Sequence, residues 1–338
     1  MKTDTKTPNQ KMLEAELAEI RTSLVNDIVL ARGNPLAQAN KNSKKTHRVR
    51  YTHKKVLLGH YNKIQDLDWC VDNKHLVSCA IDGRIIVWNA YSNDKIHAIK
   101  HPTQYLTTCK YSPSQSEVAV GDLNNTCTIY ALHGPRAGTV KQSLTGHTGS
   151  IYDCSFVDKD YILTASGDGT INEWNVECGK QLGTFRGHNK DVLSLAHIPG
   201  TSYFFSGSID NTVRLFDTRN RECIRVFYGH TADVNGVTLF PNKTMFGTAS
   251  EDGSSNLYDL RHRDPIATYT QKESKAPITS VAFSPSGNLL FAGSQDNNVY
   301  VYDTISQSPY AYLAVHDRPV TVVKIQNKDG FITTDDFF

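Results

Sequence analysis

Short runs of alternating apolar and polar residues fill most of the chain, and turn-forming residues separate them at even intervals. One stretch contains the runs Ser150–Phe156, Tyr161–Ser166 and Thr170–Asn175, with Asp168-Gly169 just ahead of the last run. Asp-Gly suits a tight hairpin, because Gly tolerates positive φ and Asp bonds nearby amides. Strand and turn signals in this order predict an antiparallel four-stranded sheet.

The pattern repeats about every 42 residues. An acidic or amide residue precedes an aromatic residue by six positions in Asp82/Trp88, Asn124/Tyr130, Asp168/Trp174, Asp210/Phe216, Asp252/Tyr258 and Asp296/Tyr302. His60, His147, His188 and His230 each follow Gly, and His316 is a degenerate equivalent. The gaps of 87 residues before His147 and 86 after His230 each span two units. Seven units of this length predict an all-β fold, a seven-bladed β-propeller.

The repeated histidines could indicate catalysis or metal binding, but an internal hydrogen-bond relay explains them better. A buried carboxylate needs donors, a buried Trp N–H needs an acceptor, and a hydroxyl can bridge them. Ser166, Ser208, Ser250 and Ser294, each two residues before the turn acid, are the expected hydroxyls. The other relay residues are His60, Asp82, Trp88, His147, Asp168, Trp174, His188, Asp210, His230 and Asp252. A catalytic group would not be copied into every blade, so a structural role is predicted.

Residues 8–32 have a helical pattern. Thr7-Pro8-Asn9-Gln10 has the form of a capping box with Pro at the first helical position, and Gly33 and Pro35 supply a stop. The apolar seam consists of Leu13, Leu17, Ile20, Leu24 and Ile28. So narrow a seam predicts a coiled-coil-type helix that needs a partner helix; packing against its own propeller is the alternative.

These signals divide the chain into a disordered tail (1–7), the helix (8–32), a basic linker (33–48) and the propeller (49–338). A first strand is expected at about Val49–Leu58, where it would close blade seven. The lysines and arginines of residues 41–55 lack interleaved aromatic stacking residues, which favours a solvated linker over nucleic-acid contact. Weak attraction to an anionic membrane is the second interpretation.

Composition narrows the function further. The 36 basic and 34 acidic residues give a net charge of +2, too small to attract nucleic acid or a membrane surface. Seven dispersed cysteines without a C-x-x-C pair indicate a reducing cytosol and no zinc or redox site. Neither a signal peptide nor a membrane-spanning run is evident. No P-loop or unrepeated catalytic cluster is present, so we expect no cofactor, no metal and no enzyme activity.

A heptad-patterned helix followed by such units, starting at Leu58-Gly59-His60, resembles the heterotrimeric G-protein β subunits of the WD-repeat class. The resemblance covers essentially the whole chain. Sharper matches are Lys63-Ile64 before Trp69, Asp82-Gly83 to Trp88, Lys95-Ile96-His97-Ala98-Ile99, Gly146-His147-Thr148-Gly149, Gly187-His188 with Asp191-Val192, and Asp252-Gly253 leading to Tyr258-Asp259-Leu260. The alternative is a general WD-repeat scaffold similar to the receptor for activated C kinase, but that family lacks a coiled-coil helix before its first blade.

The resemblance implies a non-catalytic subunit. Its N-terminal helix and lower propeller would hold an obligate γ subunit, and its upper face would bind a GDP-loaded α subunit. Release of α would expose that face to effectors, with receptors as further partners. A lipid on the γ subunit would hold the complex at the inner face of the plasma membrane. By position, the α-contact residues are Tyr61, Lys63, Gln65, Lys95, Tyr105, Thr107, Leu123, Asn125, Ser150, Asp191, Leu193, Asp233, Asn235 and Glu251.

Several of these positions depart from the family. Its members have Tyr at Gln65 and Ser150, Trp at Tyr105, Met at Thr107 and Leu193, and Asp at Glu251. Large aromatic residues and Met are common interface anchors, so α binding with different anchors is expected.

The seventh unit departs as well. Asp336 takes its turn position, and the aromatic six residues later would fall beyond Phe338. A blade lacking most of one strand is therefore expected, with Phe337-Phe338 as candidates to fill the gap. A rearranged three-stranded blade and a shortened sequence remain alternatives.

Overall fold

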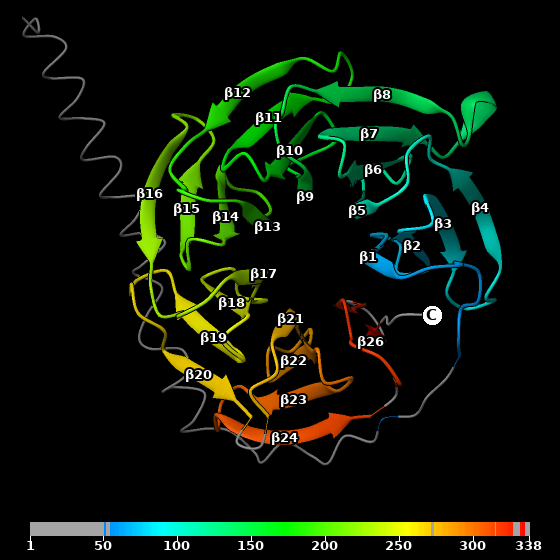
Figure 1. Cartoon of the computed structure of the whole chain (residues 1–338). Coiled ribbons are helices and arrows are strands. Elements are labelled where there is room, and N and C mark those ends of the chain that lie inside the picture. Colours follow the sequence, from blue (N-terminus) through cyan, green and yellow to red (C-terminus); the bar gives the residue numbers. More distant parts are fainter. Residues whose placement is uncertain (1–50, 52–54, 272–273, 315, 327–331, 335–338) are drawn as a thin grey trace, which may run out of the picture. The chain divides into compact units, whose positions relative to one another are not determined.

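The computed structural model describes residues 51, 55–271, 274–314, 316–326 and 332–334, which all belong to the compact unit Arg48–Phe338. These residues form six four-stranded antiparallel sheets and one two-stranded sheet, arranged as a β-propeller (Figure 1). The expected tail, helix 8–32, linker 33–48 and residues Asp335–Phe338 lie outside the described residues.

The strands follow the chain in order, four to a sheet, with a short 3-10 helix, Gly134–Arg136, between the last two strands of the second sheet. The first sheet has β1 (Ile64–Trp69), β2 (His75–Ala80), β3 (Arg84–Asn89) and β4 (Lys95–Lys100). The second has β5 (Leu106–Tyr111), β6 (Glu117–Asp122), β7 (Thr126–Ala131) and β8 (Val140–Thr145). The third has β9 (Ile151–Phe156), β10 (Tyr161–Ser166), β11 (Ile171–Asn175) and β12 (Gln181–Phe185).

The fourth sheet has β13 (Val192–His197), β14 (Tyr203–Ser208), β15 (Val213–Asp217) and β16 (Glu222–Phe227). The fifth has β17 (Val234–Leu239), β18 (Met245–Ser250), β19 (Ser254–Asp259) and β20 (Ala267–Thr270). The sixth has β21 (Ile278–Phe283), β22 (Leu289–Ser294), β23 (Val299–Asp303) and β24 (Ser308–Leu313). The two-stranded sheet has β25 (Val323–Ile325) and β26 (Ile332–Thr334).

The turn between the second and third strands has the same backbone conformation in all six four-stranded sheets. Its second residue has positive φ, between 66° and 78°, and is Gly or Asn throughout: Gly83, Asn125, Gly169, Asn211, Gly253 and Asn297. Gly and Asn adopt that conformation at little cost, so the Gly or Asn at this place in each repeat sets the position of the hairpin.

The first strand of each sheet lies nearest the centre and the fourth lies outermost (Figure 1). Strands β1, β5, β9, β13, β17 and β21 contact one another in sequence around the centre. Aromatic side chains fill the space between sheets: Phe205 and Phe246, from the fourth and fifth sheets, have ring centroids 4.2 Å apart, and Phe227 lies 4.9 Å from Phe246. Burial of such rings is the main stabilising term between blades.

Polar side chains on the innermost strands also join adjacent sheets. A backbone N–H of one sheet donates to a carboxylate of the sheet before it. Tyr111 N–H donates to Asp68 (3.0 Å), and Leu195 N–H donates to Asp153 (2.7 Å). The Lys110 ammonium pairs with Asp66 of the first sheet and lies 3.4 Å from Asp153 of the third. Burial acts to lower the pKa of Lys110, but these carboxylates raise it well above its ordinary value, so the amine stays charged.

The two-stranded sheet contacts both the sixth and the first sheet and thereby completes the ring. Trp69 Nε1 of the first sheet donates to Thr333 Oγ1 of β26 (3.0 Å). Thr321, two residues before β25, donates its Oγ1 hydrogen to the Ile64 carbonyl of the first sheet (3.1 Å). The expected first strand, Val49–Leu58, is wrong for its described residues, 51 and 55–58, which are not in a strand. A strand needs a hydrogen-bonding partner, and the partner expected here was blade seven.

Candidate protein-binding surface

The third unit shows how the repeated His, Asp and aromatic residues interact. Trp174 Nε1 donates to Thr164 Oγ1 (2.8 Å), and the same hydroxyl bonds to His147 Nε2 (2.8 Å). The other ring nitrogen, Nδ1, bonds to Asp168 Oδ2 (2.8 Å). With the proton on Nδ1, every member of this chain has a partner, which is what burial of polar groups requires.

The same arrangement recurs in three further units. The histidine Nε2 bonds to Ser78 in the first, Ser206 in the fourth and Thr248 in the fifth, at 2.7, 2.7 and 2.6 Å. Its Nδ1 faces Asp82, Asp210 and Asp252, at 3.3, 2.9 and 2.9 Å. In the first unit, Trp88 Nε1 donates to Ser78 Oγ (2.8 Å).

The expected hydroxyls, two residues before the acid, are wrong. The bridging hydroxyl lies four residues before it, in the middle of the second strand. Thr164 pairs with Asn172 of the third strand, so the aromatic residue, Trp174, is its diagonal neighbour. Ser166 instead donates to the Gly149 carbonyl (2.8 Å) and accepts the Asp168 N–H (3.2 Å), so it holds the turn. Residues two apart share one face of a strand, which is why sequence spacing alone did not separate the two roles.

In the second and sixth units, other side chains make the hydrogen bonds that the relay makes elsewhere. In the second, His101 Nδ1 accepts from Thr103, and Thr103 Oγ1 donates to Asp122 Oδ2 (2.9 Å). His101 lies 41 residues after His60, a spacing that should have revealed it. In the sixth, the Tyr300 hydroxyl donates to Asp296 in place of a histidine.

The relay acids are held ionised. Burial acts to raise the pKa of Asp168, but hydrogen bonds from His147 and Thr170 lower it far below its ordinary value, and Asp210 and Asp252 behave alike. Burial lowers the pKa of His60, which keeps the imidazole neutral. Because the side chains of His147 and Asp168 are only 1% and 13% exposed, the relay stabilises the fold and has little access to a substrate.

A pocket of about 300 Å³ lies among the starts of the innermost strands. Its lining consists of Gln65, Tyr105, Leu106, Thr107, Leu123, Tyr152, Leu193 and Asn235. Six of these are predicted α-contact residues: Gln65, Tyr105, Thr107, Leu123, Leu193 and Asn235. Tyr105 and Leu123 are 52% and 41% exposed, so large apolar side chains are presented to solvent there.

A repeated β-bulge builds this pocket. In every four-stranded sheet, the pairing of the first two strands skips the second residue of the first strand: Gln65, Thr107, Tyr152, Leu193, Asn235 and Thr279. A bulge frees a residue from the ladder and re-aims its side chain. Five of the six bulge residues line the pocket, so the surface follows from the fold of each unit.

Tyr152 was missed by the sequence analysis, which took Ser150 as the contact of the third unit. Alignment of the repeats places Tyr152 level with Thr107 and Leu193, at spacings of 45 and 41 residues, and would have found it. Burial and the neighbouring Asp191 raise the pKa of the Tyr152 phenol. Ser150 Oγ donates to the Leu123 carbonyl (3.0 Å) and supports the pocket wall.

The remaining predicted contacts do not line the pocket. They are Tyr61, Lys63, Lys95, Asn125, Ser150, Asp191, Asp233 and Glu251. Tyr61, 74% exposed, lies against the Arg84 guanidinium, and Lys95 lies over the Trp88 ring, 5.5 Å from its centroid. Burial lowers the pKa of Lys63. Glu251 accepts from Asn235 Nδ2 (3.1 Å), which links it to the pocket.

This surface combines exposed aromatic and aliphatic side chains with amides and separate charges, a composition usual at protein–protein contacts. No helix in the described part of the chain has the length and apolarity that a membrane crossing needs.

Four-stranded sheets around a ring, with a His–hydroxyl–Asp relay in most of them, define a β-propeller of the WD-repeat class. Within that class the chain belongs to the G protein beta WD-40 repeat protein family, whose model matches residues 9–337.

The chain is 49% identical over 297 residues to the Homarus americanus guanine nucleotide-binding protein G(I)/G(S)/G(T) subunit beta-1, covering 87% of each chain. It is 46% identical over 324 residues to the Lymnaea stagnalis guanine nucleotide-binding protein subunit beta, covering 95% of each. Matches of this length and identity confirm the resemblance and do not favour the general scaffold.

Proposed function

We propose that this protein is the non-catalytic β subunit of a heterotrimeric G protein. Family membership over residues 9–337 supports this role, and the pocket rim gives it a physical basis. The single observation that carries the proposal is that six predicted α-contact residues, from four units, gather around one pocket.

The proposed mechanism is competition for a rigid surface. A GDP-loaded α subunit covers the pocket and its rim, and effectors bind the same residues after α leaves. The bulge residues are fixed by their sheets, so binding needs little reorganisation and the two partners exclude each other sterically. Tyr105, Leu123 and Tyr152 are the proposed anchors, because large side chains at the centre of a patch contribute most to affinity. Tyr105 and Leu123 are exposed, and Tyr152 is half-buried.

We also propose that β25 and β26 belong to a seventh blade. His316 Nε2 bonds to Thr334 Oγ1 (2.6 Å) at a separation of 18 residues, the separation of His230 and Thr248 in the fifth unit. In other units the relay acid lies four residues after the bridging hydroxyl. The residue four positions after Thr334 is Phe338, whereas the expected turn acid, Asp336, lies two positions earlier.

The helix at 8–32 is proposed to pair with a γ subunit through Leu13, Leu17, Ile20, Leu24 and Ile28. A lipid on that partner would place the complex at the inner face of the plasma membrane. Co-expression with small helical proteins that end in a Cys-a-a-X motif tests this. Soluble, monodisperse protein made without any partner would count against an obligate γ subunit.

Charge reversal tests the α-contact surface. The double variant Lys63→Glu, Asp233→Lys is expected to lose more than about 10-fold in capture of GDP-loaded α, equivalent to about 1.4 kcal/mol, while γ binding is kept. The matched control, Lys159→Glu with Asp94→Lys, changes two exposed charges that are not predicted contacts and should capture α normally.

Affinity purification of the full chain under GDP, and again under a non-hydrolysable GTP analogue, provides the second readout. An α subunit should co-purify only with GDP. Equal recovery in both nucleotide states, or unchanged capture by the charge-reversed variant, would place the contact elsewhere.

A further inference from the structure

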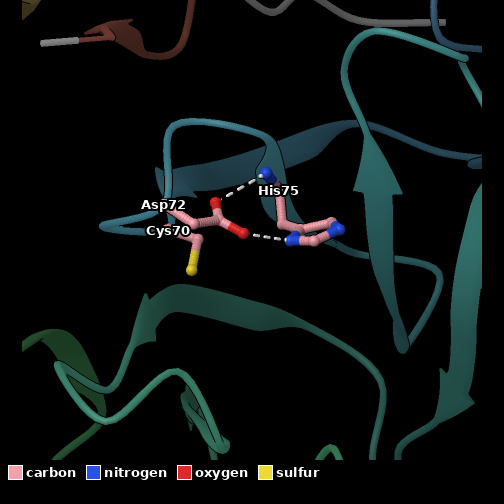
Figure 2. A group of neighbouring side chains, drawn as sticks. All are labelled: Cys70, Asp72 and His75. Carbon is pink, nitrogen blue, oxygen red and sulfur yellow. Dashed lines mark hydrogen bonds and ion pairs between the residues drawn. The ribbon is translucent and has the colours of Figure 1, made fainter. Parts of the chain in front are cut away.

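Cys70, Asp72 and His75 meet in the turn that joins β1 to β2. Their potential ligand atoms (Sγ, a carboxylate oxygen and a ring nitrogen) all lie within 4.8 Å of one another. Figure 2 shows Asp72 between the other two, with its carboxylate turned toward the His75 ring. This group takes no part in the relay or in the pocket, which lies at the opposite end of β1, near Gln65.

The turn holds the three side chains in place. Cys70 N–H donates to the His75 carbonyl (2.9 Å), and Asn73 N–H donates to the Cys70 carbonyl (3.0 Å). Asp72 Oδ1 accepts the Lys74 and His75 amides, at 2.8 and 3.0 Å, and Oδ2 bonds to His75 Nδ1. Ligands ordered by the backbone in this way lose little entropy when an ion binds.

The site is buried on one side and open on the other. Cys70 is only 3% exposed, whereas the side chains of His75 and Asp72 are 33% and 21% exposed. An ion could reach the sulfur from the Asp72 and His75 side.

We propose that this turn binds one divalent transition-metal ion of the Zn²⁺ type through Cys70 Sγ, Asp72 Oδ2 and His75 Nδ1. Sulfur, nitrogen and oxygen donors together suit Zn²⁺ and Co²⁺ and disfavour Mg²⁺ and Ca²⁺, which take oxygen ligands. In a tetrahedral site neighbouring ligand atoms are about 3.5 Å apart, so small side-chain rotations from the present separations suffice. Water would fill the fourth position on the open side.

Binding changes the protonation of two ligands. The ion takes the place of the hydrogen bond between His75 Nδ1 and Asp72 Oδ2, so the imidazole proton moves to Nε2 by exchange with solvent. The Cys70 thiol loses its proton to solvent, and one proton is released for each ion bound. The spacing Cys-x-Asp-x-x-His contains no C-x-x-C pair, so no metal site was expected here from the sequence.

Cobalt is the probe that tests the proposal, because a thiolate ligand gives Co²⁺ a charge-transfer band in the near ultraviolet. The full-length protein, with any partner that co-purifies, is titrated with Co²⁺. We expect this band and intense visible bands of a four-coordinate ion, saturating at one ion per chain. Zn²⁺ should bleach both.

Three variants locate the ligands. Cys70→Ser should abolish the charge-transfer band, and His75→Gln should weaken Co²⁺ binding more than about 10-fold. The matched control, Cys178→Ser, removes an exposed thiol and should leave the titration unchanged. Thermal melting of each variant checks that the fold is intact.

Lack of a charge-transfer band in the parent protein, or its persistence in Cys70→Ser, would overturn the proposal and leave Asp72 as a hydrogen-bonding turn residue only. Loss of the band in Cys178→Ser would do the same. None of these results depends on α or γ binding, so this proposal and the proposed function fail separately.

Discussion

Substitution of Thr164 by Val tests the relay while the shape of the core is kept. Thr164 is fully buried, and its hydroxyl accepts from Trp174 and bonds to His147. Valine has nearly the same volume but leaves Trp174 Nε1 and His147 Nε2 without a hydrogen-bond partner. Each orphaned buried group costs about 1–3 kcal/mol, so we expect a loss of about 2–5 kcal/mol in the free energy of unfolding. For a propeller of this size, such a loss lowers Tm by roughly 5–10 °C.

Urea unfolding followed by Trp fluorescence and circular dichroism measures this loss. Two controls separate the hydroxyl from its surroundings. Thr164→Ser keeps the oxygen, as Ser78 and Ser206 do in other units, and should cost much less than Thr164→Val. Thr268→Val removes an exposed hydroxyl from β20 and should change stability by less than about 0.5 kcal/mol. Equal stability of Thr164→Val and Thr164→Ser would refute the relay as a stabilising element.

Three further outcomes are expected. Lys110→Met should cost about 3–5 kcal/mol, because it leaves Asp66 buried without its cation, and adding Asp66→Asn should recover part of the loss in the same urea assay. Burial lowers the pKa of His60 below that of the unfolded chain, so the unfolded chain binds a proton more readily than the folded state. The free energy of unfolding should therefore fall as the pH drops below about 6.5. Urea midpoints that do not change between pH 8 and 5.5 would contradict this. Tyr152→Ala should weaken capture of GDP-loaded α more than Ser150→Ala does, as measured by surface plasmon resonance, because only Tyr152 lines the pocket.

Much of the propeller could be predicted from local sequence. The predicted strands of the third unit begin and end within one residue of the observed ones, because alternation of apolar residues sets each strand and Asp168-Gly169 sets the hairpin between β10 and β11. The histidine-to-acid spacing was also readable, since it repeats. Family resemblance then supplied six of the eight residues that line the pocket, although their large anchors had changed.

Only the tertiary structure decided which equivalent side chains meet. The choice of Thr164 over Ser166 as the bridging hydroxyl depends on cross-strand register, which two positions on one strand face do not reveal. Tyr152 reaches the pocket through a bulge: alignment of the repeats marks its position, but pairing between strands decides where its side chain lies. The periodic pattern of apolar and turn residues determined the repeated sheet, because strands and hairpins depend on residues that are close in sequence. The pocket, the Lys110 ion pairs and the ring closure needed the fold, because they join residues from different units of the repeat.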